Sequence, residues 1–358
     1  MQLFKCTHCN QPVYFDNYFC TSCHHQLGFD VQQMAMVALT PLESEQVLEE
    51  AQTQKKYKYC QNHQYNVCNW VLAHDHDSDF CQACVLNRVI PDVSNPEYLQ
   101  RWHKIELAKH RLVYAILRWN LPLVSKYQDQ DYGLAFDFKA DPQTPNAPKV
   151  MTGHDNGLIT LNIAEADDVE RAMARDQMDE VYRTVLGHFR HEIGHYYWDV
   201  LVDNSDFLEP FRALFGDERL DYQEALDRHY HDGPPNNWME SFISSYATMH
   251  PWEDWAETWA HYLHMIDVLE TADSFGLSLK PKVVREHAYH SMNLMETLEP
   301  YQHENFEDIY QSWLAVSFAM NSLNRSMGHG DFYPFVINTQ VKQKMQFIHQ
   351  VIRSAHST

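Results

Sequence analysis

The chain has 358 residues, enough for one large domain or two to three ordinary ones. Hydrophobic residues make up 44% and charged residues 21%, which fits a globular protein with a real core and excludes a disordered, collagenous or low-complexity chain. The 49 acidic and 27 basic residues give a formal net charge of −22. This charge repels nucleic-acid phosphates and anionic lipids, so we expect neither nucleic acid nor a membrane among the partners.

Targeting signals are not evident in the sequence. The segment MQLFKCTHCN at the N-terminus has no basic region and no apolar run, so we expect no secretory signal. The longest mainly apolar run, Trp313–Met320, spans about eight residues, far below the roughly 20 that a membrane helix needs. We therefore expect a cytoplasmic protein. In that reducing compartment, clustered cysteines bind metal more often than they form disulfides.

The distribution of cysteines suggests two domains. All eight cysteines precede residue 85, and none follows. We therefore place a boundary near Ile90, with a zinc-ribbon region at 1–90 and a second domain at 91–358. Between the two cysteine clusters, Thr40 is a candidate N-cap, which predicts a short helix from Thr40 to Gln52.

Beyond residue 91 the pattern is mostly helical. Asn95-Pro96 has the character of a helix start, and apolar residues recur at helical spacing from Tyr98 to Trp119. Two partly alternating runs, 132–138 and 157–163, predict short strands. Further helices are expected at about 165–202, 206–215, 218–230, 238–245, 252–272, 281–297, 303–325 and 338–354. The predicted class is α+β, mostly helical with a small sheet.

The cysteines form two sets of four, and each set predicts a closed structural zinc site. In the first set, two C-x2-C pairs are separated by ten residues; the members are Cys6, Cys9, Cys20 and Cys23. The second set is looser and consists of Cys60, Cys68, Cys81 and Cys84. His63, His74 and His76 are alternative ligands there, and iron is an alternative metal at the first site. Disulfides or free thiols are the non-metal alternative.

The motif HEIGH at residues 191–195 falls in an expected helix, 181–202. Residues four apart share a helix face, so His191 and His195 can bind one zinc ion while Glu192 holds and deprotonates a water molecule. Gly194 would let another element pack closely. The alternative is an ordinary amphipathic helix with two surface histidines.

A catalytic zinc ion needs a third protein ligand. The metzincin pattern is excluded, because it requires Gly and His where this chain has Trp198 and Leu201. The segment YATMHPWEDWAETWA at residues 246–260 instead offers Glu253 and Glu257, which lie four apart on one face of an otherwise apolar helix. Buried carboxylates need a partner, and a metal site would provide one.

These motifs resemble those of the gluzincin metallopeptidases, in which a helical HExxH is followed by Glu-x-x-Ala-Glu on a second helix. The spacing of Tyr, six residues and Glu is similar to the lethal-factor-like branch. The resemblance implies that Glu253 is the third zinc ligand, that Tyr246 stabilises the oxyanion, and that Glu257 orients a ligand histidine.

The layout is closer still to a bacterial family of zinc-binding metallopeptidases that is defined by its motifs. Its members carry an N-terminal zinc ribbon, HEIGH, a segment like YATxHPWEDWAETWAHYLH and a stretch like LNRSMG…DxYPF, found here at residues 323–335. The resemblance spans nearly the whole chain and implies a zincin-like domain with one catalytic and two structural zinc ions. In zincin folds the edge strand of the small sheet binds an extended peptide, a role that the strand at 157–163 would fit. A structural hairpin is the alternative.

Several further polar residues are secondary candidates. His250, His261 and His264 are expected in the core or in solvent rather than on the metal. His188 shares the helix face of His191, and Arg325 is expected in a salt bridge rather than on a peptide carboxylate. His154 and Asp155 precede the second strand and are candidates for contact with the cleft.

Three functions follow as hypotheses. The first is a zinc peptidase acting on a peptide or protein substrate. The second is a narrow amidase or isopeptide deconjugase on the same fold. The third is an adaptor with an inactive peptidase body. In each, the zinc-ribbon region is the expected surface for a protein partner.

Overall fold

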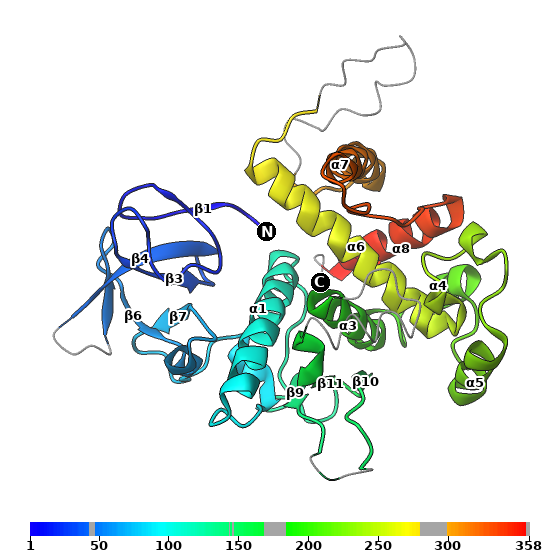
Figure 1. Ribbon diagram of the computed structural model, residues 1–358, viewed down its shortest axis with the longest axis horizontal. Coiled ribbons are helices and arrows are strands. Elements are labelled where there is room, and N and C mark those ends of the chain that lie inside the picture. Colours follow the sequence, from blue (N-terminus) through cyan, green and yellow to red (C-terminus); the bar gives the residue numbers. More distant parts are fainter. Residues whose placement is uncertain (43–46, 143, 145–146, 168–183, 280–298, 356–358) are drawn as a thin grey trace. The chain divides into compact units, whose positions relative to one another are not determined.

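The computed structural model describes residues 1–42, 47–142, 144, 147–167, 184–279 and 299–355 (Figure 1). The chain divides into two compact units, one formed by Met1–Val113 with Val124–Arg171 and the other by Tyr114–Leu123 with Ala172–Thr358. The boundary expected near Ile90 remains a prediction. Among the described residues, no helix has the length and apolar character needed to cross a bilayer.

The first unit opens with a short hairpin of β1 (Phe4–Lys5) and β2 (Pro12–Val13). A closed five-stranded barrel follows, made of β3 (Gln26–Asp30), β4 (Ala35–Pro41), β5 (Leu48–Glu50), β6 (Lys56–Tyr59) and β7 (Trp70–Ala73). Neighbouring strands are antiparallel, except that β3 and β7 run parallel where the barrel closes. Its core is formed by Val37, Leu39, Leu48, Tyr57 and Val71.

The short helix expected from Thr40 to Gln52 is wrong. The two ends of this segment belong to β4 and β5, which pair with each other through Thr40 and Glu49. Leu48 is buried and also pairs with Tyr57 of β6. Pairing on both sides of β5 overrides the local helix-start pattern, because strand formation depends more on neighbouring strands than on intrinsic preference. Residues 43–46 lie outside the described part.

The rest of the first unit contains a small sheet and most of a long helix. The strand order is β10 (Gly153–Asp155), β11 (Leu158–Asn162), β9 (Ala135–Lys139) and β8 (Asn87–Val89). Strands β9 and β11 confirm the two expected strands, whereas β8 and β10 were not expected. Helix α1 (Pro96–Arg118) is confirmed, and the Asn95 side chain accepts the Glu97 N–H at 3.0 Å at its start.

The peptide-binding role expected for the strand at 157–163 is wrong for that strand. β11 pairs with β10 on one side and β9 on the other, so its main chain has no open edge. Among the described residues, β10 and β8 are the edge strands of this sheet. His154 lies in β10, and its Nε2 accepts the Gly157 N–H at 2.9 Å, a contact that stabilises the turn.

The second unit is helical. Its described elements are α3 (Val185–Leu201), α4 (Leu208–Phe215), α5 (Tyr222–Asp232), α6 (Pro251–Ser274), α7 (Phe306–Ser326) and α8 (Thr339–Ala355), with 3-10 turns η4 (Trp238–Glu240) and η5 (Tyr246–Thr248). Helices α4 to α8 confirm five expected helices, and the mixture of helices and small sheets confirms the α+β class. The continuous helix expected at about 165–202 is wrong, because Ile163–Ala166 forms a 3-10 turn (η3) and α3 begins only after Thr184, whose backbone is extended. The helix expected at 281–297 lies outside the described residues, as do 168–183.

The continuous helix expected at 238–245 is wrong. The 3-10 turn η4 forms only the first three residues of this segment, and η5 follows directly after it. The Ser244 hydroxyl accepts the Ala247 N–H at 3.1 Å, and the Thr248 hydroxyl donates to the Ser245 carbonyl at 2.7 Å. Such local side-chain bonds compete with the helical pattern.

Candidate metal centres

Helices α3 and α6 of the second unit pack closely at Gly194. A β-carbon at this position would lie 3.1 Å from the Ala256 Cα and 3.2 Å from the Trp259 ring. The Trp255 indole N–H donates to the Gly194 carbonyl at 2.8 Å. The expected close packing at Gly194 is therefore confirmed, and it brings the HEIGH motif against the acidic helix.

We expect Gly194→Val to destabilise the protein by about 1–3 kcal/mol, because the added methyl groups would force α3 and α6 apart. Thermal or urea unfolding measures the change. The control is Gly330→Val, at a site where a β-carbon meets nothing within 4 Å. Equal stability of the two variants would contradict the close packing of the helices.

Three potential ligands converge where α3 meets the first turn of α6. The Nε2 atoms of His191 and His195 lie 3.2 Å apart. Glu253 places Oε2 2.9 Å from His191 Nε2 and Oε1 3.5 Å from His195 Nε2. Glu253 is 2% exposed and His195 is 3% exposed, so this is an interior cluster.

The spacing of these three atoms fits a zinc ion. With zinc–ligand bonds of about 2.0–2.2 Å, the corners of a tetrahedron lie about 3.3–3.6 Å apart. The observed separations, 2.9–3.5 Å, are close to this range. Two imidazoles and a carboxylate are also the donor set that a catalytic zinc site uses.

The His191 ring is held in place by Glu257. Its Nδ1 lies 2.7 Å from Glu257 Oε1, and the other carboxylate oxygen accepts the Ser244 hydroxyl at 2.6 Å. Both ring nitrogens of His191 face carboxylates, which only accept; burial lowers the pKa of His191, but these contacts raise it overall. Nδ1 donates to Glu257, and Nε2 is the nitrogen whose proton a metal ion would replace. Burial opposes the charge on Glu257, but the His191 and Ser244 hydrogen bonds lower its pKa to about 2.

Two tyrosines lie beside Glu253. The Tyr222 hydroxyl donates to Glu253 Oε1 at 2.8 Å and is also hydrogen-bonded to Tyr246. The Tyr246 and His191 ring centroids are 6.0 Å apart. Burial, and then the Glu253 charge, raise the pKa of Tyr246 above its usual range, so its hydroxyl stays protonated. Sequence reasoning missed Tyr222, which lies on α5 and has no motif spacing to the other site residues.

Glu192 lies on the same helix as the two histidines, and it is 9% exposed. Burial raises its pKa, while the nearby His191 and His195 charges lower it. The net shift is upward, so this carboxylate accepts a proton more readily than an exposed one. The Trp252 ring lies over His195, with 3.9 Å between ring centroids.

The secondary histidines are structural. The His250 side chain caps α6 by accepting the Trp252 N–H at 3.1 Å. His261 is buried, with Nδ1 2.8 Å from the Tyr333 hydroxyl, and His264 is buried against Arg190. None of the three belongs to a group with metal-ligand spacing among the described residues.

The salt bridge expected for Arg325 is confirmed. Its Nε and Nη2 atoms pair with the two carboxylate oxygens of Asp331 at 2.5 and 2.6 Å.

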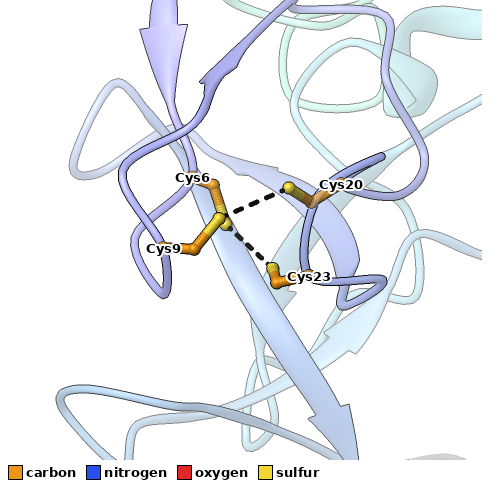
Figure 2. Close-up of side chains that lie close together, drawn as sticks. All are labelled: Cys6, Cys9, Cys20 and Cys23. Carbon is orange, nitrogen blue, oxygen red and sulfur yellow. Dashed lines mark hydrogen bonds between the residues drawn. The ribbon is translucent and has the colours of Figure 1, made fainter.

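The first cysteine set, in the first unit, forms a compact four-sulfur cluster (Figure 2). Cys6 and Cys23 Sγ lie 3.6 Å apart, as do Cys9 and Cys20 Sγ. Zinc–sulfur bonds of about 2.3 Å put tetrahedral corners about 3.8 Å apart, whereas a disulfide bond is about 2.05 Å long. The arrangement fits a metal site, and the described cysteines form no disulfide.

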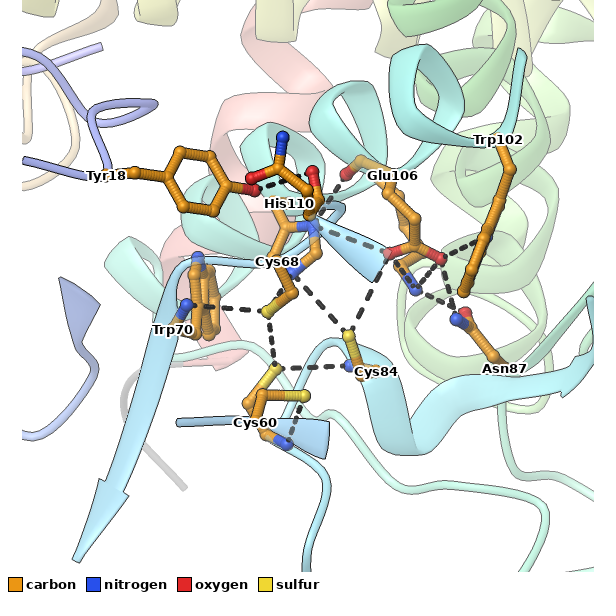
Figure 3. A network of polar contacts seen from close by, with 12 residues as sticks. Tyr18, Cys60, Cys68, Trp70, Cys84, Asn87, Trp102, Glu106 and His110 are labelled. Carbon is orange, nitrogen blue, oxygen red and sulfur yellow. Dashed lines mark hydrogen bonds and ion pairs between the residues drawn. The ribbon is translucent and has the colours of Figure 1, made fainter. Parts of the chain in front are cut away.

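The second set is also brought together, and all four of its sulfur atoms lie within 4.8 Å of one another (Figure 3). Cys68 and Cys81 Sγ are 3.8 Å apart. The alternative ligands from the sequence are not part of the cluster: His63 Nδ1 lies 2.9 Å from the Cys68 carbonyl oxygen, and its ring stacks on Tyr59. His74 and His76 are exposed.

Sequence reasoning missed His110 of α1 at this second set. Its Nε2 lies 3.2 Å from Cys68 Sγ and 3.8 Å from Cys84 Sγ. Glu106, one helical turn earlier, has Oε2 4.0 Å from Cys84 Sγ. Both residues lie far from any cysteine in sequence, so only the fold reveals their position.

Two families match this chain. Residues 98–351 match the family described as "Putative zinc-binding metallo-peptidase", and residues 3–95 match a zinc-ribbon domain family. Uncharacterized proteins of Mycobacterium bovis and Mycobacterium tuberculosis are 43% identical over 353 residues, covering 98% of this chain and 95% of theirs. No solved structure is detectably similar. The chain therefore belongs to this family of zinc-binding metallopeptidases and carries an N-terminal zinc-ribbon domain.

Proposed function

We propose that this protein is a zinc-dependent peptidase or amide hydrolase of the gluzincin type. The observation that carries the proposal is that ligand atoms of His191, His195 and Glu253 all lie within 4.8 Å of one another. Glu192 lies on the same helix, α3, as the two histidines. His191, His195 and Glu253 would hold the ion. Zinc bound there would supply a Lewis acid for the scissile carbonyl and lower the pKa of water toward about 7.

Glu192 is the general base in this proposal. Its carboxylate takes the proton of the attacking water and later passes it to the leaving amine. An upward-shifted pKa, caused by burial, suits both steps, because the residue must accept the proton and then release it.

Tyr246 is the proposed oxyanion donor. Because its pKa is raised, its hydroxyl carries a proton that can be donated to the oxygen on which charge develops. Tyr222 instead contacts Glu253 and fixes the orientation of this carboxylate. Glu257 does the same for His191.

We expect Tyr246→Phe to lower kcat by about 10²–10³ while KM and bound zinc stay nearly unchanged, because the hydroxyl acts only on developing charge. Steady-state kinetics with a cleaved substrate and elemental analysis measure the two effects.

Tyr222→Phe is the matched control for Tyr246→Phe, since it removes a hydroxyl from the same site. Loss of the Tyr222 hydroxyl should weaken the affinity for zinc by about 10–100-fold, and excess zinc should restore activity. If Tyr246→Phe also lost its defect in excess zinc, Tyr246 would be a positioning residue and not the oxyanion donor.

A peptide library tests the reaction class. Cleavage of many library members by the zinc-loaded chain, absent in Glu192→Gln, supports a peptidase. Cleavage confined to one isopeptide or small amide would support the narrow amidase or deconjugase instead. Failure of the zinc-loaded chain to hydrolyse any amide would leave the adaptor hypothesis.

The two cysteine sets are proposed to hold one structural zinc ion each. The sulfur separations of 3.6–3.8 Å support this, and a reducing, cytoplasmic location is consistent with thiols that are not oxidised. Closed four-ligand sites leave no position for a substrate, so we assign the zinc-ribbon region to docking of a protein partner or substrate.

A further inference from the structure

A fifth potential donor lies beside the second metal position in the first unit. The sulfur atoms of Cys60, Cys68, Cys81 and Cys84 form one group, and His110 Nε2 approaches two of them, those of Cys68 and Cys84 (Figure 3). With bonds of about 2.0 Å to nitrogen and 2.3 Å to sulfur, ligand atoms at two corners of a zinc tetrahedron lie about 3.6 Å apart. The two His110–sulfur distances, 3.2 and 3.8 Å, bracket that value.

The backbone fixes which nitrogen of His110 faces the sulfurs with a lone pair. His110 Nδ1 lies 2.6 Å from the Glu106 carbonyl oxygen, which can only accept. Nδ1 therefore carries a proton, and Nε2 is the ring nitrogen that faces Cys68 and Cys84. This is the nitrogen that can bind an ion held by those sulfur atoms.

The charge buried in the cluster also favours His110 as a ligand. The four cysteines are 1–2% exposed, and His110 is 3% exposed. Four thiolates around one divalent zinc ion leave two net negative charges in this interior, whereas three thiolates and one imidazole leave one. The Lys109 charge offsets this excess only in part, because its ammonium group pairs with Glu106 at 2.9 Å.

A second ion bound by Cys84, Glu106 and His110 does not fit. Glu106 Oε1 already accepts from the Asn87 amide at 2.6 Å and from the Trp102 indole at 3.0 Å. The buried Lys109 ammonium group adjoins both carboxylate oxygens and would repel a cation there.

We propose that His110 is a direct ligand of the second ion, so that this site is built from three thiolates and one imidazole. The fourth cysteine remains a thiol beside the ion. His110 lies in the part of the chain that matches the metallopeptidase family, while the cysteines lie in the zinc-ribbon match. The ion would thus link the zinc-ribbon region to helix α1 through shared coordination.

Cadmium-113 NMR on the full-length chain tests this assignment, with cadmium loaded in place of zinc and histidine labelled with nitrogen-15. We expect one resonance at the position of a four-sulfur site, from the first cysteine set. The second set should give a resonance shifted toward nitrogen ligation and coupled to a single histidine nitrogen. Two four-sulfur resonances without nitrogen coupling would overturn the proposal and make His110 a neighbour of the site only.

Variants assign the coupling to one residue. In His110→Ala, the coupling should vanish and the second resonance should move to the four-sulfur position, as the remaining thiol takes the free corner. The matched control is His63→Phe, which keeps the ring stacked on Tyr59 and should leave the coupled resonance in place. Persistence of the coupling in His110→Ala would exclude His110 as the ligand.

Discussion

Glu192→Gln is expected to abolish measurable hydrolysis, with a loss of about 10²–10⁴ in kcat, while the protein keeps its full zinc content. The substitution preserves the shape of a side chain that is 9% exposed, so folding should not change. It removes the only proposed group that takes the proton from water. Because this carboxylate is not one of the three proposed ligands, the variant should lose activity while its zinc content stays unchanged.

The control for this variant is Glu224→Gln on α5. That side chain is exposed and pairs only loosely with Arg228, at 3.7 Å. The control should keep both activity and zinc. A Glu192→Gln protein that retained wild-type kcat would show that another base acts in the reaction.

Loss of the first cysteine site should produce the largest structural effect. The hairpin of β1 and β2 pairs only two residues per strand and cannot be stable alone. Zinc binding in such small modules supplies about 10–16 kcal/mol of folding free energy. We expect Cys20→Ser to lose one ion per chain and to expose residues 1–25 to proteases.

Elemental analysis and limited proteolysis measure these two effects of Cys20→Ser. Ser22→Ala is the matched control, because Ser22 lies in the same turn and its side chain is exposed. Retention of all metal and of protease resistance in Cys20→Ser would mean that the first cysteine cluster is held by packing around Phe15 and Phe29 instead.

Sequence periodicity predicted that the second unit is helical, but it placed the starts of α3 and α5 too early and overlooked the caps that set them. Thr184 caps α3 by accepting the Gly187 N–H at 2.9 Å, and Asp221 caps α5 by accepting the Glu224 N–H at 2.8 Å. The same local reading failed at Thr40, where strand pairing within the barrel decides the structure. A barrel depends on pairing between strands that are distant in sequence, and the pattern of neighbouring residues does not reveal such pairing.

The candidate catalytic residues could be named from sequence because their spacing reflects helix geometry. His191 and His195, like Glu253 and Glu257, are four apart and share a helix face. Tyr222 and His110 could not be found this way. Each reaches its cluster from a separate helix, and only the packing of the fold brings it there.

Metal content of the wild-type chain and of a variant carrying both His195→Ala and Glu253→Ala tests the central claim most directly. A site formed by His191, His195 and Glu253 predicts about three zinc ions per wild-type chain and about two in the variant, with both cysteine sites still filled. About two ions in both proteins would contradict a catalytic metal centre on α3 and α6, and with it the proposed hydrolase.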